Sequence, residues 1–248
     1  MSELFSIQLQ NRQQQGRDGV WLDLPTTTEQ VQASLRQIGI SSDNPQALFI
    51  SGYFAEEEKL FAIPYNMVLA SSVDELNFLA ARLETLSAGE RAELNAALQA
   101  PQSDLSSIGK ITDFPENVEY YVHLPDVHGP AQLGDYYLNR SGMVDMPEEW
   151  KGGIDTAQFG RYVAHQEQGV FTQYGYLVKS GDEWQKVHEG QPVPEEYRVL
   201  SFPAPEILRD AANIPPPVQP EMEPQKVIPI MQKRSTVYGS SGSAFTTT

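Results

Sequence analysis

Residues 72–98 read SVDELNFLAARLETLSAGERAELNAAL and contain two consecutive helix-start signals. Ser72 is followed three residues later by Glu75, and Ser87 by Glu90. In such a capping box the serine oxygen accepts a bond from a backbone N–H of the first turn, and the glutamate accepts one from the serine N–H. Apolar residues then recur at the spacing of one helix face. They are Leu76, Leu79, Ala80, Leu83 and Leu86 in the first helix, and Leu94, Ala97 and Leu98 in the second. The stretch predicts a helical unit at residues 65–110, closed by Pro101 and a polar connector at residues 102–109.

The residues before this unit change to the two-residue period of strands. Phe5, Ile7 and Leu9 share one face of a predicted strand at residues 4–9, and GRDG at residues 16–19 predicts a turn. In chain order we expect strands at residues 4–9, 20–24 and 47–54, and, between the last two, a helix that starts at a Thr26–Glu29 capping box and buries Val31, Leu35 and Ile38. Residues 1–64 are therefore predicted to form a small antiparallel sheet with one packed helix.

The residues after the helical unit mix both periods, which predicts a third unit at residues 111–177. Val118, Tyr120, Val122 and Leu124 alternate with polar or aromatic residues, so we expect them on the inner face of a strand. We also expect a helix at residues 133–140 ended by Gly142, a helix at residues 154–167 with Phe159, Tyr162 and Val163 inside, and a strand at residues 169–178. The predicted fold class is α+β.

The remaining chain has a different composition. We expect a polar hairpin extension at residues 178–203, turning at Ser180, Gly181 and Asp182. Eight of the 27 residues from 203 to 229 are proline, which disfavours both helix and sheet. Residues 204–248 are therefore predicted to be a proline-rich and disordered tail.

Charge is the most informative total. The chain has 33 acidic and 17 basic residues, a formal net charge of −16. Residues 1–177 hold 24 acidic and 10 basic residues, whereas residues 178–248 hold 9 and 7. Nucleic acids and anionic lipids bind basic surfaces, so we expect neither direct nucleic-acid binding nor membrane binding.

Several site classes lack their residues. The absence of cysteine excludes disulfides, thiolate metal sites and cysteine nucleophiles. Neither a signal-peptide pattern nor an apolar run of about 18 residues is present, so we expect a cytoplasmic protein. His123, Asp126 and His128 lie close in sequence but match no known metal motif, and Pro125 and Pro130 favour a surface loop there.

Other patterns also have a simpler interpretation than catalysis. Phosphate-binding glycine motifs are missing, and adjacent carboxylates such as Glu148 and Glu149 stand in solvated contexts rather than as a shielded acid beside an exposed base. The aromatic residues of the third unit lack the basic neighbours of a base-stacking platform, which favours core packing or a protein surface. We therefore predict no enzyme, and no catalytic, cofactor or metal residues.

Short motifs that follow one another in order resemble the ArdA antirestriction family. The first unit contributes GVWLDLP at residues 19–25, and the helical unit contributes SVDELN at residues 72–77 with Leu83 and Leu86. The third unit contributes LGDYY at 133–137, SG at 141–142, MPEEW at 146–150, ID at 154–155, FGR at 159–161, GVF at 169–171 and GY at 175–176. The resemblance covers residues 4–177 and leaves the C-terminal extension unmatched.

This resemblance implies an elongated arrangement of three small domains that pairs into a homodimer. Such a dimer imitates bent B-DNA and occupies the DNA groove of type I restriction-modification enzymes, so that incoming mobile DNA escapes cleavage. The family has no cofactor. The carboxylates that we expect to contribute to the mimic surface are Glu56, Glu57, Glu58, Asp74, Glu75, Glu84, Asp113, Glu116, Glu119, Asp126, Asp135, Asp145, Glu148 and Glu149.

A charge-density argument sets a condition on this hypothesis. B-DNA carries one negative charge per ~1.7 Å of axis, so 24 carboxylates match roughly 40 Å, whereas a net charge of −14 matches only about 24 Å. Mimicry therefore requires that basic residues face away from the binding surface. Two alternatives remain open: an acidic adaptor of a mobile element that binds another basic protein, and a carboxylate hydrolase with one buried carboxyl group.

Overall fold

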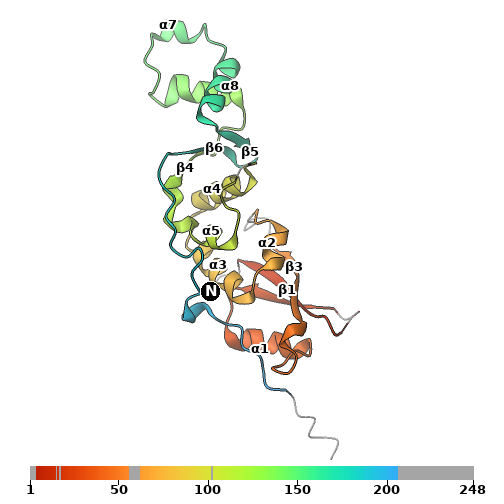
Figure 1. The fold of residues 1–248 in the computed structure, drawn as a ribbon. Helices are drawn as coiled ribbons and strands as arrows, with labels where there is room; N and C mark the ends of the chain where they lie inside the picture. Colours follow the sequence, from red (N-terminus) through yellow and green to blue (C-terminus); the bar gives the residue numbers. More distant parts are fainter. Residues whose placement is uncertain (1–3, 15, 17, 56–61, 102, 206–248) are drawn as a thin grey trace, which may run out of the picture. The chain divides into compact units, whose positions relative to one another are not determined.

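The first sheet and its helix form as the alternating pattern predicts. The structure is a computed structural model that describes residues 4–14, 16, 18–55, 62–101 and 103–205. Strands β1 (Phe5–Asn11), β2 (Val20–Leu24) and β3 (Leu48–Phe54) form an antiparallel sheet of order β2-β1-β3, and α1 (Thr28–Gln37) packs beside β2 (Figure 1). Phe5, Ile7 and Leu9 are buried, as predicted.

The start of α1 differs by one residue from the prediction. The cap is Thr27, whose side chain accepts from the backbone N–H of Gln30, and Gln30 completes the box in place of Glu29. A capping box that starts at Thr26 would need the N–H of Thr26 to donate to Glu29, but this N–H donates to Oδ1 of Asn77 at 2.7 Å. A contact with a distant helix therefore decides where α1 begins.

The helical region contains both predicted capping boxes. Helix α3 (Val73–Glu84) starts at Ser72 with Glu75, and α4 (Ala88–Gln99) starts at Ser87 with Glu90. The predicted apolar face of α3 is buried, with Leu76, Leu79 and Leu83 fully enclosed. Two short helices that we did not predict, α2 (Tyr65–Ala70) and α5 (Ile108–Thr112), pack against β3 and α3 respectively.

The second sheet corrects the predicted strand at residues 118–124. Residues Val118–Tyr120 form a 3-10 turn, η4, and the strand β4 covers only Tyr121–Leu124. Tyr121 is buried and Val122 is 45% exposed, so the inner and outer positions are the reverse of those expected. The turn shifts the strand by one position, and a shift of one residue exchanges the two faces of a strand.

The predicted strand at residues 169–178 is in fact a tight hairpin. Strands β5 (Val170–Thr172) and β6 (Gly175–Lys179) pair with each other, and β6 also pairs with β4, giving the order β4-β6-β5. Both sheets are antiparallel and helices lie beside them, which confirms the predicted α+β class. The elongated three-domain arrangement remains a prediction.

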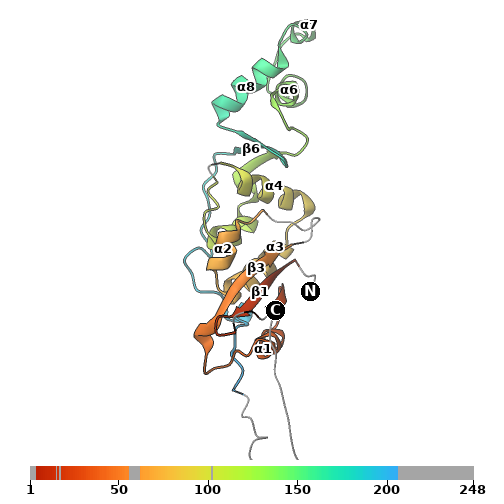
Figure 2. The ribbon, with the colours of Figure 1, turned by 90° about the vertical axis from the view of Figure 1, so that its right-hand side faces the viewer.

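Two helices beyond β4 pack unusually closely. Helix α6 (Pro130–Asp135) continues into a π-turn, η5 (Tyr136–Arg140), and lies against α8 (Thr156–Glu167) (Figure 2). Gly142 has a left-handed φ of 69°, as expected for the predicted stop. A Cβ atom on Gly160 would lie 1.8 Å from the carbonyl oxygen of Pro130, so only glycine permits this approach.

Part of the predicted inner face of α8 is wrong. Tyr162 is 62% exposed, whereas Val163 packs against the small core of this region. That core consists of Val127, Leu133 and Tyr176 with partly buried neighbours. The close approach at Gly160 turns a different side of α8 inward, which leaves Tyr162 outside. A short helix, α7 (Glu148–Lys151), precedes α8 and carries Trp150, which is 69% exposed.

The predicted hairpin at residues 178–203 is wrong. After β6 the described chain forms no further strand, and its one helical turn is η6 (Glu195–Tyr197). Residues 180–203, called the strap below, instead run past α5 and α3 to α1 (Figure 1). In a hairpin, the backbone N–H and C=O groups of residues 180–203 would bond to a second strand. In the structure, several of these groups bond instead to polar side chains of the main body. Of the predicted tail at residues 204–248, only residues 204 and 205 lie within the described part of the chain.

Candidate functional site

The carboxylates of the predicted acidic surface have different environments in the structure. Glu56, Glu57 and Glu58 lie outside the described residues. The others divide into carboxylates that the fold itself uses, carboxylates in ion pairs and carboxylates that face solvent. The first group is the weakest set of candidates, because the protein's own N–H and hydroxyl groups already bind those carboxylates.

Asp113 is completely buried and is used by the fold. It follows α5, and its carboxylate accepts three backbone N–H groups of the strap. His188 donates to Oδ1 at 2.6 Å, while Val187 and Glu189 donate to Oδ2 at 3.2 and 3.1 Å. With a relative exposure of 0%, Asp113 cannot touch a protein partner. The structure therefore removes it from the candidate surface.

Asp74 and Glu75 are also engaged. Oδ1 of Asp74 accepts the backbone N–H groups of Val199 and Leu200, at 2.8 and 2.7 Å. The carboxylate of Glu75 accepts the N–H and hydroxyl of Ser72 in the capping box, although the residue itself is exposed. Glu84 is half-buried on the last turn of α3. The two acidic residues in the first turn of α3 thus have structural roles: Asp74 binds the strap and Glu75 caps the helix.

Three candidates are ion-paired. Glu116 pairs with Arg82, Asp135 with Arg140, and Glu148 with Lys151. Hydrogen bonds from Asn139 and then from Arg140 hold the pKa of Asp135 below its ordinary value. In each pair a positive side chain lies beside the carboxylate and offsets its negative charge. These three carboxylates therefore contribute less negative potential to the surface than their number suggests.

Four candidates face solvent: Glu119, Asp126, Asp145 and Glu149. They come from η4, from the loop after β4 and from the segment around α7. Residues 113–149 contain eight acidic residues and a single basic one, Arg140, which is already paired with Asp135. The charge segregation that mimicry requires is therefore strongest in this stretch of the sequence.

Two carboxylates outside the predicted set, Glu93 and Asp104, have specific environments. Glu93 on α4 is partly enclosed, and its Oε1 has no hydrogen-bond partner among the described residues. Burial, and then the charge of Glu90, raises the pKa of Glu93 to about 7. Asp104 pairs with Lys179 at 2.6 Å and accepts the hydroxyl of Tyr120. No sequence signal separates these residues from ordinary surface carboxylates.

Glu167 closes the small core between α6, α8 and the second sheet. Its two carboxylate oxygens accept the hydroxyl groups of Tyr137 and Tyr176. Burial and the Glu167 carboxylate raise the pKa of both tyrosines well above the ordinary value. The sequence favours core packing or a protein surface for the aromatic residues of this unit, and the structure places Tyr176 in the core with Tyr137 packed against it.

Two cavities of about 620 and 650 Å³ open on the described part of the chain. The first is lined partly by His165, Glu167 and Lys179, and the second lies between α3, α5 and the strap, beside Phe78 and His188. Among the residues described, no group of three histidine, aspartate or glutamate side chains is placed to hold a metal ion. In the same residues no helix is both long and apolar enough to cross a membrane.

Comparison with known proteins decides the family. Residues 15–178 match the family described as Antirestriction protein (ArdA), which is more than half of the chain. The chain belongs to the ArdA family. A search of curated proteins found no match. The ArdA match begins at residue 15, between the end of β1 and the start of β2, and ends within β6, at residue 178.

The limits of the ArdA match separate two parts of the structure. All four solvent-facing candidate carboxylates lie inside it, whereas the strap lies outside it. Membership in the ArdA family assigns an antirestriction role, whose target is a restriction enzyme. The strap has no counterpart in the matched region, so only its own contacts indicate its role.

Proposed function

We propose that this chain is an antirestriction protein that mimics DNA. It occupies the DNA-binding groove of a type I restriction-modification enzyme and so protects incoming mobile DNA. The observation that carries the proposal is the ArdA match, which coincides with the acidic part of the chain. We propose further that it acts in the cytoplasm as a homodimer and has no catalytic activity of its own.

The charges of residues 113–149 support this proposal. A DNA-binding groove is lined by basic residues that neutralise phosphates. Glu119, Asp126, Asp145 and Glu149 are exposed and form no ion pair with any residue that the structure describes. Carboxylates of this kind can take the place of phosphates, whereas Asp113 cannot, because it is buried and backbone N–H groups of the strap occupy both of its oxygens.

The direct test is inhibition of a purified type I enzyme. We expect the protein to reduce cleavage of unmodified DNA, to compete with DNA for the enzyme, and to lose affinity as salt rises. If no enzyme in a panel of type I systems is inhibited at low salt, the proposal is wrong. If the protein binds another basic protein but not these enzymes, the adaptor alternative is supported instead.

A charge-matched pair of variants tests the surface itself. The triple variant Glu119→Gln, Asp126→Asn and Glu149→Gln removes three exposed carboxylates within the family match. We expect inhibition to weaken by about tenfold, since each exposed charge contributes up to about 1 kcal/mol.

The matched control removes three exposed carboxylates of the strap: Glu183→Gln, Glu195→Gln and Glu196→Gln. Both triples change the net charge equally. Mimicry by the 113–149 surface predicts that only the first triple weakens inhibition. Equal weakening by both would mean that overall charge, rather than a defined surface, governs binding.

A further inference from the structure

The strap is held by side chains of the main body that bind its backbone. Asp113 accepts the N–H groups of three consecutive strap residues, Val187, His188 and Glu189. Four residues later in the main chain, Asn117 pairs with both backbone groups of Gln185: its Oδ1 accepts the N–H at 2.7 Å and its Nδ2 donates to the carbonyl at 3.0 Å. This first attachment site lies at the end of α5 and just beyond it.

A second attachment site lies on α3. Oδ1 of Asp74 accepts the N–H groups of Val199 and Leu200, and Nδ2 of Asn77 donates to the carbonyl of Tyr197 at 3.0 Å. The same Asn77 side chain accepts the N–H of Thr26 through its Oδ1. One amide therefore joins α3, the strap and the residue before α1.

A third attachment site lies in the first unit. The N–H of Ser42 donates to the carbonyl of Pro203 at 2.9 Å, and Gln32 on α1 donates to the hydroxyl of Ser201. Val199 and Pro203 are buried, and Trp184, Leu200 and Phe202 pack against the main core. Polar bonds thus fix the course of the strap, and apolar residues anchor it.

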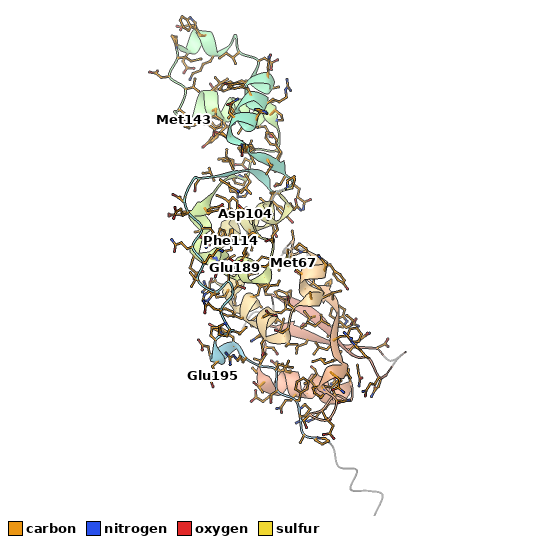
Figure 3. The ribbon with its side chains drawn as sticks, viewed as in Figure 1. Met67, Asp104, Phe114, Met143, Glu189 and Glu195 are labelled. Atoms are coloured by element: carbon orange, nitrogen blue, oxygen red, sulfur yellow. The ribbon has the colours of Figure 1, made fainter. Side chains whose placement is uncertain are left out.

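An aromatic contact lies between the first and second attachment sites. Phe78 of α3 meets the ring of His188 at a centroid distance of 5.0 Å and that of Tyr197 at 4.7 Å. Figure 3 shows Glu189 of the strap near Phe114, and Glu195 further along at η6. A Cβ atom on Gly109 of α5 would lie 3.2 Å from Cα of Glu189, so the strap lies directly on α5.

We propose that the strap is an intramolecular clamp that lies outside the ArdA-matched region and holds α1, α3 and α5 in one fixed arrangement. Its receptors are the side chains of Asp74, Asn77, Asp113 and Asn117, and the groups they bind belong to the strap backbone. Docking therefore depends on the receptor residues and little on the strap side chains that face solvent. The clamp involves no restriction enzyme. A test of the clamp therefore does not depend on whether the proposed antirestriction function is correct.

Replacement of Asp74 and of Asp113 by asparagine should affect docking of the strap differently. Only Oδ1 of Asp74 is used, so Asp74→Asn keeps the acceptor and should keep the strap docked. Both oxygens of Asp113 accept N–H groups, so Asp113→Asn turns an amide N–H₂ toward a backbone donor and should release the strap. Glu196→Ala, on the strap but exposed, is the control.

Hydrogen exchange of the full-length variants measures docking. We expect the backbone N–H groups of residues 187–189, 199 and 200 to be protected in the unchanged protein, in Asp74→Asn and in Glu196→Ala. In Asp113→Asn those of residues 187–189 should exchange at least about tenfold faster. Equal protection in Asp113→Asn and the unchanged protein would overturn the assigned role of Asp113.

A cleavage experiment avoids any variant that fails to fold. A protease site inserted between Gly181 and Asp182, in the exposed turn after β6, is cut after folding. A clamp predicts that the 182–248 fragment still co-elutes with the body in native buffer and leaves it in dilute denaturant before the body unfolds. A fragment that separates at once in native buffer would overturn the clamp.

Distance measurements test what the clamp does. The chain has no cysteine, so Gln37→Cys on α1 and Ser106→Cys, just before α5, both exposed, give one pair of spin-label sites on elements that the clamp joins. We expect one narrow distance distribution in the intact protein and a distribution at least about twofold broader after the strap is cut and washed away in dilute denaturant. An unchanged distribution would show that the core alone fixes the arrangement.

Discussion

At the scale of single residues, a carboxylate's surroundings decide what it can do. Asp113 and Asp126 are the same residue type in the same acidic stretch, yet Asp113 is buried among backbone donors and Asp126 is exposed. Burial of a carboxylate is tolerable only when hydrogen bonds replace the lost water, and the strap supplies three such bonds to Asp113. Glu93 lacks that compensation at Oε1.

Glu93 should therefore make stability depend on pH. Its pKa is raised from 4.5 to about 7 in the folded protein, so the folded state favours the protonated carboxyl. The stabilisation is complete below about pH 4.5 and is lost as pH rises through about 7. We expect Glu93→Gln to be more stable than the unchanged protein by about 1 kcal/mol at pH 8, a value reduced because solvent screens this partly exposed group. The difference should vanish near pH 4.5.

Urea denaturation at several pH values checks this prediction, and Glu90→Gln is the opposite-sign control. Hydrogen bonds from the side chain and then the backbone of Ser87 lower the pKa of Glu90, so its contribution is present at neutral pH and is lost in acid. Glu90→Gln should thus be less stable than the unchanged protein at pH 8. A Glu93→Gln variant with the same stability difference at pH 4.5 and pH 8 would contradict the proposed cause.

At the scale of elements, close backbone approaches position the third region. Helices α6 and α8 meet at Gly134 and Gly160, where Cβ atoms would lie 2.0 Å from the carbonyl oxygen of Thr156 and 1.8 Å from that of Pro130. This contact lies beside the small core of Val127, Leu133 and Tyr176. Of the exposed carboxylates, Glu119 and Asp126 precede α6 in the sequence, and Asp145 and Glu149 lie in the segment that joins η5 to α8.

Replacement of Gly160 by alanine should break this contact. The added methyl group has no space, so the helices must separate, and we expect a loss of about 3 kcal/mol or more in unfolding free energy. Gly152→Ala is the control, because a Cβ atom there meets nothing within 4 Å, and it should change stability by less than about 0.5 kcal/mol. Urea denaturation of both variants gives the comparison, and similar stabilities would show that the helix pair tolerates a wider separation.

At the scale of the whole molecule, the acidity is uneven. Residues 206–248 contain four acidic and four basic residues, so the entire net charge of −16 resides in residues 1–205. The strap contacts described above end at Pro203. Both the proposed acidic surface and the proposed clamp therefore belong to the first 205 residues.

Truncation after Pro205 should leave inhibition of a type I enzyme unchanged to within about twofold, because the net charge is the same. The thermal midpoint should also be unchanged, since every strap contact is kept. Truncation after Lys179 removes the clamp as well and should lower the midpoint. A large loss of inhibition in the first truncation would mean that residues 206–248 contact the target directly.

The sequence by itself determined the α+β class, the capping boxes at Ser72 and Ser87, the three strands of the first sheet and the family. These features depend on local periodicity and on hydrogen bonds between residues a few positions apart, so a short stretch of sequence contains their cause. The tertiary structure alone decided the start of α1, the face of β4, the strap, and the burial of Asp113. Each of these depends on a bond between distant residues, such as Thr26 with Asn77 or Asp113 with His188, and no periodicity in a single segment encodes such a pairing.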